Sequence, residues 1–194
     1  AGGGCFYRFK PDDPSTPFEG RLQALRAVDY WELPTGQLHL GDKVAIDWVD
    51  IDDADAGSGV ALEAREKGAA VFVRGEGLWI DGDDIWICCT SGGPKGRGQI
   101  FKLNDGEDGG VLELVAHADD ILVLDMPDNI CVSPWGQVYM AEDGTGDQFV
   151  RVMDTRGVVR SFARNAKSSS EFAGVCFSPD GRALFVNMQH DGLT

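Results

Sequence analysis

Three stretches of the chain repeat one pattern: an acidic residue, a short apolar run, a turn that carries glycine, and a second apolar run. They start at Gly75, Asp128 and Glu171 and read GEGLWIDGDDIWICCT, DNICVSPWGQVYMAED and EFAGVCFSPDGRALFVNM. The last two copies align without a gap over residues 130–134 and 175–179. A period of roughly 40 to 50 residues is typical of propeller blades, each of which is one antiparallel sheet. The repeat therefore predicts an all-β fold, a partial β-propeller.

Composition agrees with this fold class and excludes two classes of partner. The 26 glycines and 8 prolines separate short runs rich in Val, Ile, Phe and Trp, as expected for strands and turns. The 17 basic and 32 acidic residues give a formal charge of -15, which repels a phosphate backbone and argues against nucleic-acid binding. No apolar run approaches the roughly 18 residues that a membrane span needs. The five cysteines, an odd number without a CxxC pair, favour free thiols over a disulfide framework.

The repeat divides the chain into blades. We expect one blade over residues 72–116, with strands at 77–80, 84–90, 98–103 and 111–116, and the next over 126–163, with strands at 129–132, 137–141, 149–153 and 157–163. A half-blade with strands at 173–177 and 182–187 covers residues 171–188, and another covers 4–28. Between them, residues 30–70 are expected to be an α/β insertion with a strand at 44–51 and a short helix at 61–67. A chain of about three blade-equivalents that starts without Met predicts a piece of a larger protein, in which missing blades or partner chains cover the open edges.

Strand direction places the acidic residues of the repeat at one end of the propeller. Glu76, Asp128 and Glu171 lie at the starts of first strands, and Glu142 and Asp143 follow a second strand. In an antiparallel blade these positions share one face, and first strands line the central channel. We therefore expect carboxylates from three blades to converge at the channel mouth. Like charges in such a site raise one another's pKa or recruit cations, and calcium or ferric iron would suit the oxygen ligands.

A cationic candidate lies on the same face. Arg164 follows the fourth strand of the blade over 126–163 and could hold a phosphate group with two hydrogen bonds. Taken alone, each acidic residue also fits an ordinary turn. Their joint placement is what predicts a functional site.

Several motifs in fixed order carry a resemblance to a known family. They are FVRGEG from Phe72, TSGG from Thr90, GQI from Gly98, PDN from Pro127, EDG from Glu142, FARN from Phe162, and EFAG from Glu171 followed by FVN ending at Asn187. From about Trp48 onward this set resembles the PhoX family of alkaline phosphatases. The resemblance implies a six-bladed propeller, exported by the twin-arginine route to the periplasm or the cell exterior. It also implies hydrolysis of phosphate monoesters with ferric iron and calcium, for which Glu76, Glu142 and Glu171 are the ligand candidates.

Two other functions remain open at this stage. One is a non-catalytic PhoX-like module that serves as a binding or assembly subunit of a larger complex. The other is a sugar-lactone hydrolase on a similar propeller, which would also use channel carboxylates and calcium. The PhoX-like motifs favour the phosphatase.

Overall fold

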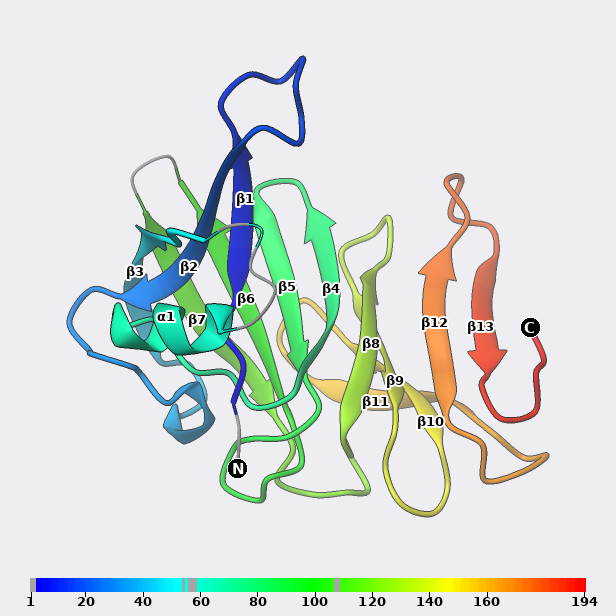
Figure 1. Cartoon of the computed structure of the whole chain (residues 1–194). Helices are drawn as coiled ribbons and strands as arrows, with labels where there is room; N and C mark the ends of the chain where they lie inside the picture. Colours follow the sequence, from blue (N-terminus) through cyan, green and yellow to red (C-terminus); the bar gives the residue numbers. More distant parts are fainter. Residues whose placement is uncertain (1–2, 54, 56–58, 107–108) are drawn as a thin grey trace.

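Short apolar runs between glycine turns fold into three antiparallel sheets (Figure 1). The computed structural model describes residues 3–53, 55, 59–106 and 109–194. The strands are β1 (Tyr7–Pro11), β2 (Gly20–Ala27), β3 (Lys43–Asp50), β4 (Gly75–Asp81), β5 (Asp84–Cys89), β6 (Gln99–Asp105), β7 (Gly110–His117), β8 (Pro127–Val132), β9 (Val138–Glu142), β10 (Phe149–Met153), β11 (Val159–Arg164), β12 (Phe172–Phe177) and β13 (Leu184–Met188). Among these described residues, helical structure is confined to η1 (Thr35–Gln37) and α1 (Val60–Glu66).

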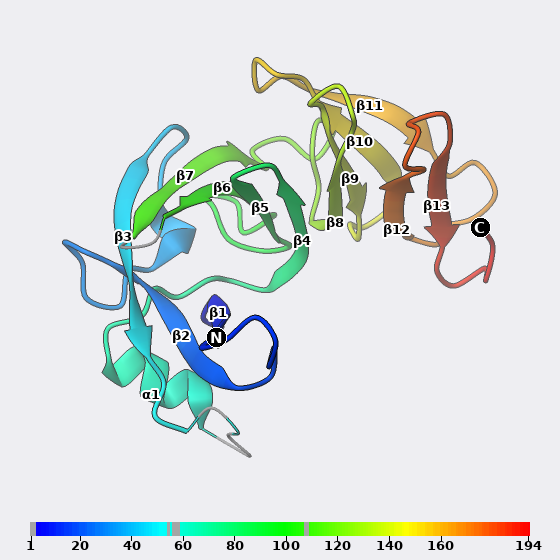
Figure 2. The ribbon, with the colours of Figure 1, turned by 90° about the horizontal axis from the view of Figure 1, so that it is seen from above.

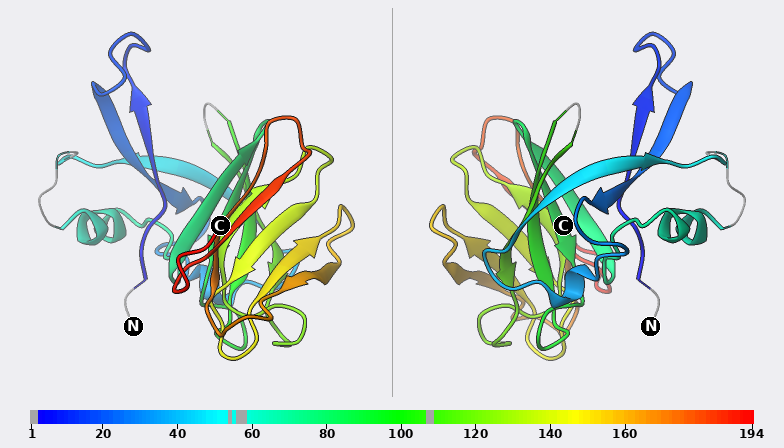
Figure 3. Two further views of the ribbon diagram at one scale, coloured as in Figure 1. Left: turned by 90° about the vertical axis from the view of Figure 1, so that its right-hand side faces the viewer. Right: turned by 90° about the vertical axis from the view of Figure 1, so that its left-hand side faces the viewer.

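The sheets are consecutive blades of a partial β-propeller. Their strand orders are β1-β2-β3-β7-β6-β5-β4, β11-β10-β9-β8 and β12-β13. Seen from above, the sheets fan out from β4, β8 and β12, which lie next to one another (Figure 2). The hairpin of β1 and β2 and helix α1 stand away from the stacked blades (Figure 3). The first strand of each repeat is thus the innermost strand of its blade, as the repeat predicted.

The seven-stranded and four-stranded sheets bury side chains on both of their faces, and the period of two along a strand assigns each residue to one face. On β5 and β6, Cys89 and Phe101 join the core inside the curl of the seven-stranded sheet, whereas Cys88 and Ile100 join the core shared with the next blade. The four-stranded sheet uses Ile130 against the first blade and its sequence neighbour Cys131 against β12 and β13. The cores between blades fix how the blades stack. All five cysteines are free thiols.

The expected strands and the helix agree with the structure to within two residues at each end. One pairing was not expected. Strand β3, which the sequence placed in an insertion over 30–70, pairs with β2 on one side and with β7 on the other. It joins the expected half-blade over 4–28 to the blade over 72–116 in one sheet, because strand order is set by hydrogen bonds between segments distant in the sequence. Among the described residues no helix is long and apolar enough to cross a membrane.

The contact between β4 and β8 leaves no room for a side chain at Gly77. A Cβ atom there would lie 2.8 Å from the carbonyl oxygen of Asp128 and 2.9 Å from the Cα of Asn129 and the backbone nitrogen of Ile130. These are backbone atoms of an inner strand, which cannot rotate away. Glycine at this position therefore allows two blades to touch at the axis.

We expect Gly77→Ala to lower the free energy of unfolding by about 1–3 kcal/mol, the usual cost of overpacking. Gly75→Ala is the matched control on the same strand, since a Cβ there meets nothing within 4 Å. Chemical denaturation of both variants measures the difference. Equal stabilities would show that β4 and β8 adjust freely.

Candidate functional site

Two acidic residues of the repeat, Glu76 and Asp128, lie in β-bulges on the inner strands of their blades. Opposite Cys88, strand β4 carries two residues, Glu76 and Gly77. On β8, Asp128 is the extra residue between two cross-strand pairs, and on β12 the register shifts between Ala173 and Cys176. Bulges bend a strand and redirect its side chains, and they are frequent next to active sites. The inner strand of each repeat is therefore irregular, and in the first two repeats the acidic residue lies within the bulge.

Arginine 74 links two of the acidic residues. Its Nη2 atom lies 3.8 Å from Oε1 of Glu76 and 3.7 Å from Oδ2 of Asp143. Arg74 has a backbone φ of 52°, a left-handed conformation that costs a residue with a Cβ roughly 1 kcal/mol or more. Its carbonyl is held by the backbone N–H of Thr90, whose hydroxyl donates to Asp128 Oδ1 at 3.3 Å. The chain thus tolerates strain where a guanidinium meets carboxylates from two blades.

The pKa of Glu171 is raised by burial and by its acidic neighbours. Burial raises this pKa, and a hydrogen bond with Asp143 and the negative charges of Asp143 and Asp128 raise it further, to about 7. In the opposite direction, the side-chain amide of Gln189 donates to Glu171 Oε1 at 2.5 Å. Asp128, Asp143 and Glu171 therefore form one electrostatic group, built from the second and third blades.

Glu142, which the sequence grouped with these residues, is held in a buried ion pair with Arg151. Its side chain is 1% exposed, and its Oε1 accepts hydrogen bonds from Arg151 Nε and from the backbone N–H of Asp125, both at 2.7 Å. Glu142 and Asp143 are successive residues at the end of a strand, so their side chains point in opposite directions. Only Asp143 turns toward the axis. Glu142 holds Arg151, which also donates to Ser161 Oγ at 2.6 Å.

Arginine 164 also lies apart from the acidic group. Its Nη1 pairs with Asp147 Oδ2 at 3.1 Å on the exposed rim. It ends β11, the outermost strand of a sheet in the order β11-β10-β9-β8, so three strand spacings, roughly 14 Å, separate its strand from that of Asp128. Arg164 therefore lies at the outer edge of its blade, away from the inner strands.

Three polar residues around the site were not singled out from the sequence. Thr90 follows β5, and Gln189 and His190 follow β13, with His190 Nε2 at 3.6 Å from Glu171 Oε1. The reasoning that selected Asp143, namely that a residue leaving the second strand faces the channel mouth, applies equally to these positions. Extending it to all three repeats would have found them.

The donor chemistry of the site suits a hard cation. Among the described residues, no three His, Cys, Asp or Glu side chains stand close enough together to hold a metal ion as they are. Two observations nevertheless fit a positive charge there. Asp143 and Asp128 raise the pKa of Glu171, so a positive charge there would relieve the repulsion among these carboxyl groups. Next to Asp128 in the same bulge, Asn129 Oδ1 is buried and has no hydrogen-bond partner among the described residues. An oxygen-rich site with a surplus of acceptors is typical of calcium ligation.

A propeller with carboxylates gathered around its inner strands defines the class of this protein. The family model for alkaline phosphatase PhoX matches residues 1–192, so the chain belongs to the PhoX family. Its structure is similar to that of Pseudomonas fluorescens PhoX in complex with vanadate, a transition state analogue, with a TM-score of 0.72 at 18% identity. The match covers 96% of this chain and 44% of that chain, so the present chain spans less than half of the solved protein. No curated protein matches it.

We expect Glu142→Gln to lower the free energy of unfolding by about 3–5 kcal/mol, because it leaves the buried Arg151 charge without its partner. The double variant Glu142→Gln/Arg151→Met should regain part of this loss, and a double-mutant cycle by chemical denaturation measures the coupling. An unfolding midpoint equal to that of the unmodified chain, together with a lower calcium content, would instead identify Glu142 as a metal ligand.

In the presence of a chelator, Glu171 should make stability depend on pH. Because its folded pKa of about 7 lies above the ordinary carboxyl value, its contribution is present below about pH 4.5 and is lost as the pH rises through 7. Relative to Glu171→Gln, the unmodified chain should lose up to about 3 kcal/mol over this interval.

The measurement is chemical denaturation of both proteins between pH 4 and pH 8. Asp154→Asn provides a control of opposite sign, since hydrogen bonds from Arg156 and Arg160 hold the pKa of Asp154 below its usual range. Its contribution is lost as the pH falls. Parallel pH profiles for the unmodified chain and Glu171→Gln would contradict the assignment.

Proposed function

We propose that the protein containing this chain hydrolyses phosphate monoesters at the axial end where Asp128, Asp143 and Glu171 meet. The observation that carries the proposal is the electrostatic grouping of these three carboxyl groups, which brings the pKa of Glu171 to about 7. Membership of the PhoX family and the likeness to Pseudomonas fluorescens PhoX support it. A dianionic substrate would be repelled by these carboxylates unless cations were bound there.

In this proposal Asp128, Asp143 and Glu171 hold calcium or ferric iron, with Glu76 beside them. The bound cations would neutralise the substrate's charge and favour attack at phosphorus. Gln189 orients Glu171 through its amide, and Thr90 orients Asp128 through its hydroxyl. These bonds preset the directions of two ligands.

Arg74 takes the phosphate-binding role that the sequence suggested for Arg164. It already lies within 4 Å of Glu76 and Asp143, and both contacts, at 3.8 Å and 3.7 Å, are longer than a hydrogen bond. Its guanidinium can turn from these loose pairs to a bound phosphoryl group, which it suits by forming two parallel hydrogen bonds. Glu142 remains a structural residue.

Two wider properties belong to the same proposal. Further blades, from the same protein or from partner chains, would complete the ring, in line with the 44% of the solved PhoX chain that this chain matches. The protein would be exported to the periplasm or the cell exterior, as is typical of the family. Its substrate would be a small phosphate monoester.

One observation favours a second candidate function. The Arg74 pairs partly offset the charges of Glu76 and Asp143 without a metal ion. On that basis the chain would be a non-catalytic PhoX-like module that contributes a surface to a larger assembly. Metal content and turnover distinguish the two.

The test uses the product of the full gene. We expect elemental analysis to find calcium and iron, and p-nitrophenyl phosphate hydrolysis to stop on chelation. Asp143→Asn and Arg74→Met should lower kcat/KM by at least about 100-fold, the usual cost of removing a transition-state contact. Asp147→Asn, an exposed acid that pairs with Arg164, is the matched control and should keep full activity. A folded protein with neither bound metal nor turnover would contradict the phosphatase proposal and favour the non-catalytic module.

A further inference from the structure

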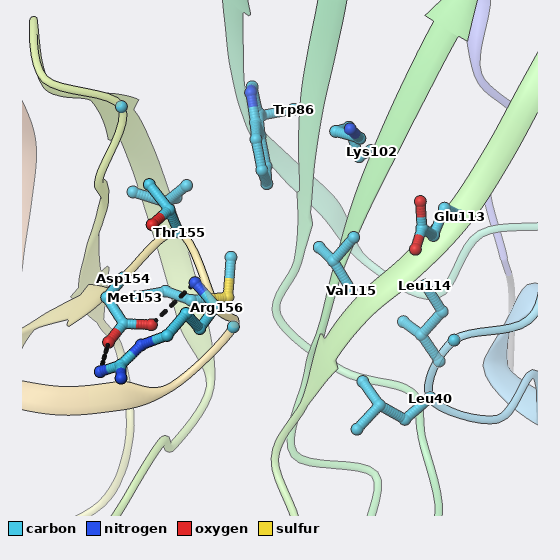
Figure 4. Close-up of a pocket in the computed structure, with 14 residues that line it drawn as sticks. Leu40, Trp86, Lys102, Glu113, Leu114, Val115, Met153, Asp154, Thr155 and Arg156 are labelled. Atoms are coloured by element: carbon cyan, nitrogen blue, oxygen red, sulfur yellow. Dashed lines mark hydrogen bonds and ion pairs between the residues drawn. The ribbon is translucent and has the colours of Figure 1, made fainter.

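The seam between the first two blades is open at one end and bridged at the other. At the end opposite the acidic group, a cavity of about 390 Å³ lies between Trp86 on the first blade and Met153 on the second (Figure 4). At the acidic end, the loop over residues 90–98, which joins β5 to β6, reaches the segments that carry the site carboxylates of the second blade. Arg97 in this loop makes the contacts.

The side chain of Arg97 joins two segments of the second blade. Its Nε atom lies 2.8 Å from Oδ1 of Asp125, and its Nη2 donates to Asp125 Oδ2 at 3.1 Å. The Asp125 side chain is 7% exposed, so salt and water screen this ion pair little. The same Nη2 lies 3.4 Å from Thr145 Oγ1, and Asp125 Oδ2 accepts from the backbone N–H of Thr145 at 3.4 Å. One guanidinium therefore ties the segment that enters β8 to the segment that leaves β9.

The backbone of Arg97 holds the residue between Asp125 and β8. Met126 donates its N–H to the carbonyl of Arg97 at 2.7 Å, and its own carbonyl accepts from the N–H of Asp143 at 2.9 Å. Met126 has a φ of 49°, a left-handed conformation that a residue with a Cβ keeps only where its surroundings impose it. Arg97 is part of those surroundings.

The first two blades enter their bulges in the same way. Arg74 and Met126 both have a positive φ, and each stands two residues before the bulge acid of its strand, Glu76 or Asp128. In both blades the residue that follows the second strand donates its N–H to the carbonyl of the strained residue. The strained entry therefore accompanies the acidic bulge.

Gly98 sets how closely the loop approaches the second blade. A Cβ atom at this position would overlap the ring of Pro127, the first residue of β8, and would lie 3.1 Å from the carbonyl oxygen of Cys89. The loop therefore packs directly beside Asp128.

We propose that Arg97 is a positioning residue of the acidic site, which holds Asp128 and Asp143 in the directions that a bound cation requires. This inference rests on the proposed function for its cation, whereas the contacts of Arg97 do not. Carboxylates that share a cation repel one another before it binds, so their backbone needs support from outside the group. Arg97 gives that support through Asp125, Thr145 and Met126.

The first measurement is hydrogen exchange by mass spectrometry on the full gene product, with a chelator present. The amides of Asp125, Met126, Asp143 and Thr145 are hydrogen-bonded within these contacts. Arg97→Met should therefore raise exchange in residues 125–128 and 142–146 by about tenfold or more, and leave β6 unchanged. Lys95→Met, at an exposed lysine of the same loop, is the matched control and should change neither segment.

The second measurement is calcium affinity by titration calorimetry, together with p-nitrophenyl phosphate turnover. Arg97→Met should weaken calcium binding by about 10- to 100-fold, the usual effect of removing a group that orients metal ligands. Arg97→Lys keeps the charge opposite Asp125 but loses the forked geometry, so it should recover part of both calcium affinity and turnover. Arg97→Met/Asp125→Asn leaves no unpaired buried charge, so it tests the site even where Arg97→Met does not fold, and it should bind calcium as weakly.

Exchange unchanged in both segments would overturn the inference whatever the activity of the protein. So would raised exchange with unchanged calcium affinity, because Arg97 would then stabilise the fold alone. An unmodified protein with neither calcium nor turnover would overturn the proposed function and this inference together. A loaded, active protein whose Arg97 variants bind calcium normally would overturn the inference alone.

Discussion

The contact between the inner strands β4 and β8 is the constraint on which the rest of the structure depends. Blades of a propeller meet most closely at the axis, and here the backbone of β8 lies where a Cβ of Gly77 would be. That approach brings the bulge carrying Glu76 close to the bulge carrying Asp128. Both bulges lie at the same end of their strands. The closeness of Glu76 and Asp128 is therefore a consequence of how the blades pack as well as of the local sequence.

The electrostatics of the axial end follow from this packing. A chain with 32 acidic residues can keep most of its charges apart on the surface, where water screens them. At the axis it cannot, since Asp128 and Asp143 from one blade raise the pKa of Glu171 from the next. A proton, Arg74 or a metal ion can each relieve the repulsion. The charge balance at this end of the propeller therefore depends on what is bound there.

Much of the fold, but only part of the site, could be predicted from the sequence. The alternation of apolar runs and glycine turns places every strand to within two residues, because it is a local signal. The pairing of β3 with β7 is not local, so it was missed. Within the site, strand direction placed Asp128, Asp143 and Glu171 at one end. Strand direction alone does not distinguish Glu142 from Asp143, whose side chains point in opposite directions because of the pleat. It also does not give the distance of Arg164 from the axis.

Glu142 shows that the role of an acidic residue in a family motif depends on which group compensates its charge. A buried carboxylate requires compensation, and either a metal ion or an arginine can supply it. In the EDG motif the first acid is compensated by an arginine. Glu142 meets Arg151, which also donates to the carbonyl of Leu122 and to Ser161 and stacks on Phe149 with its guanidinium carbon 4.1 Å from the ring centre. This buried network fixes the end of β9 and hence the position of the next residue. Asp143 can therefore be presented to the axis in a defined direction because Glu142 is locked behind it.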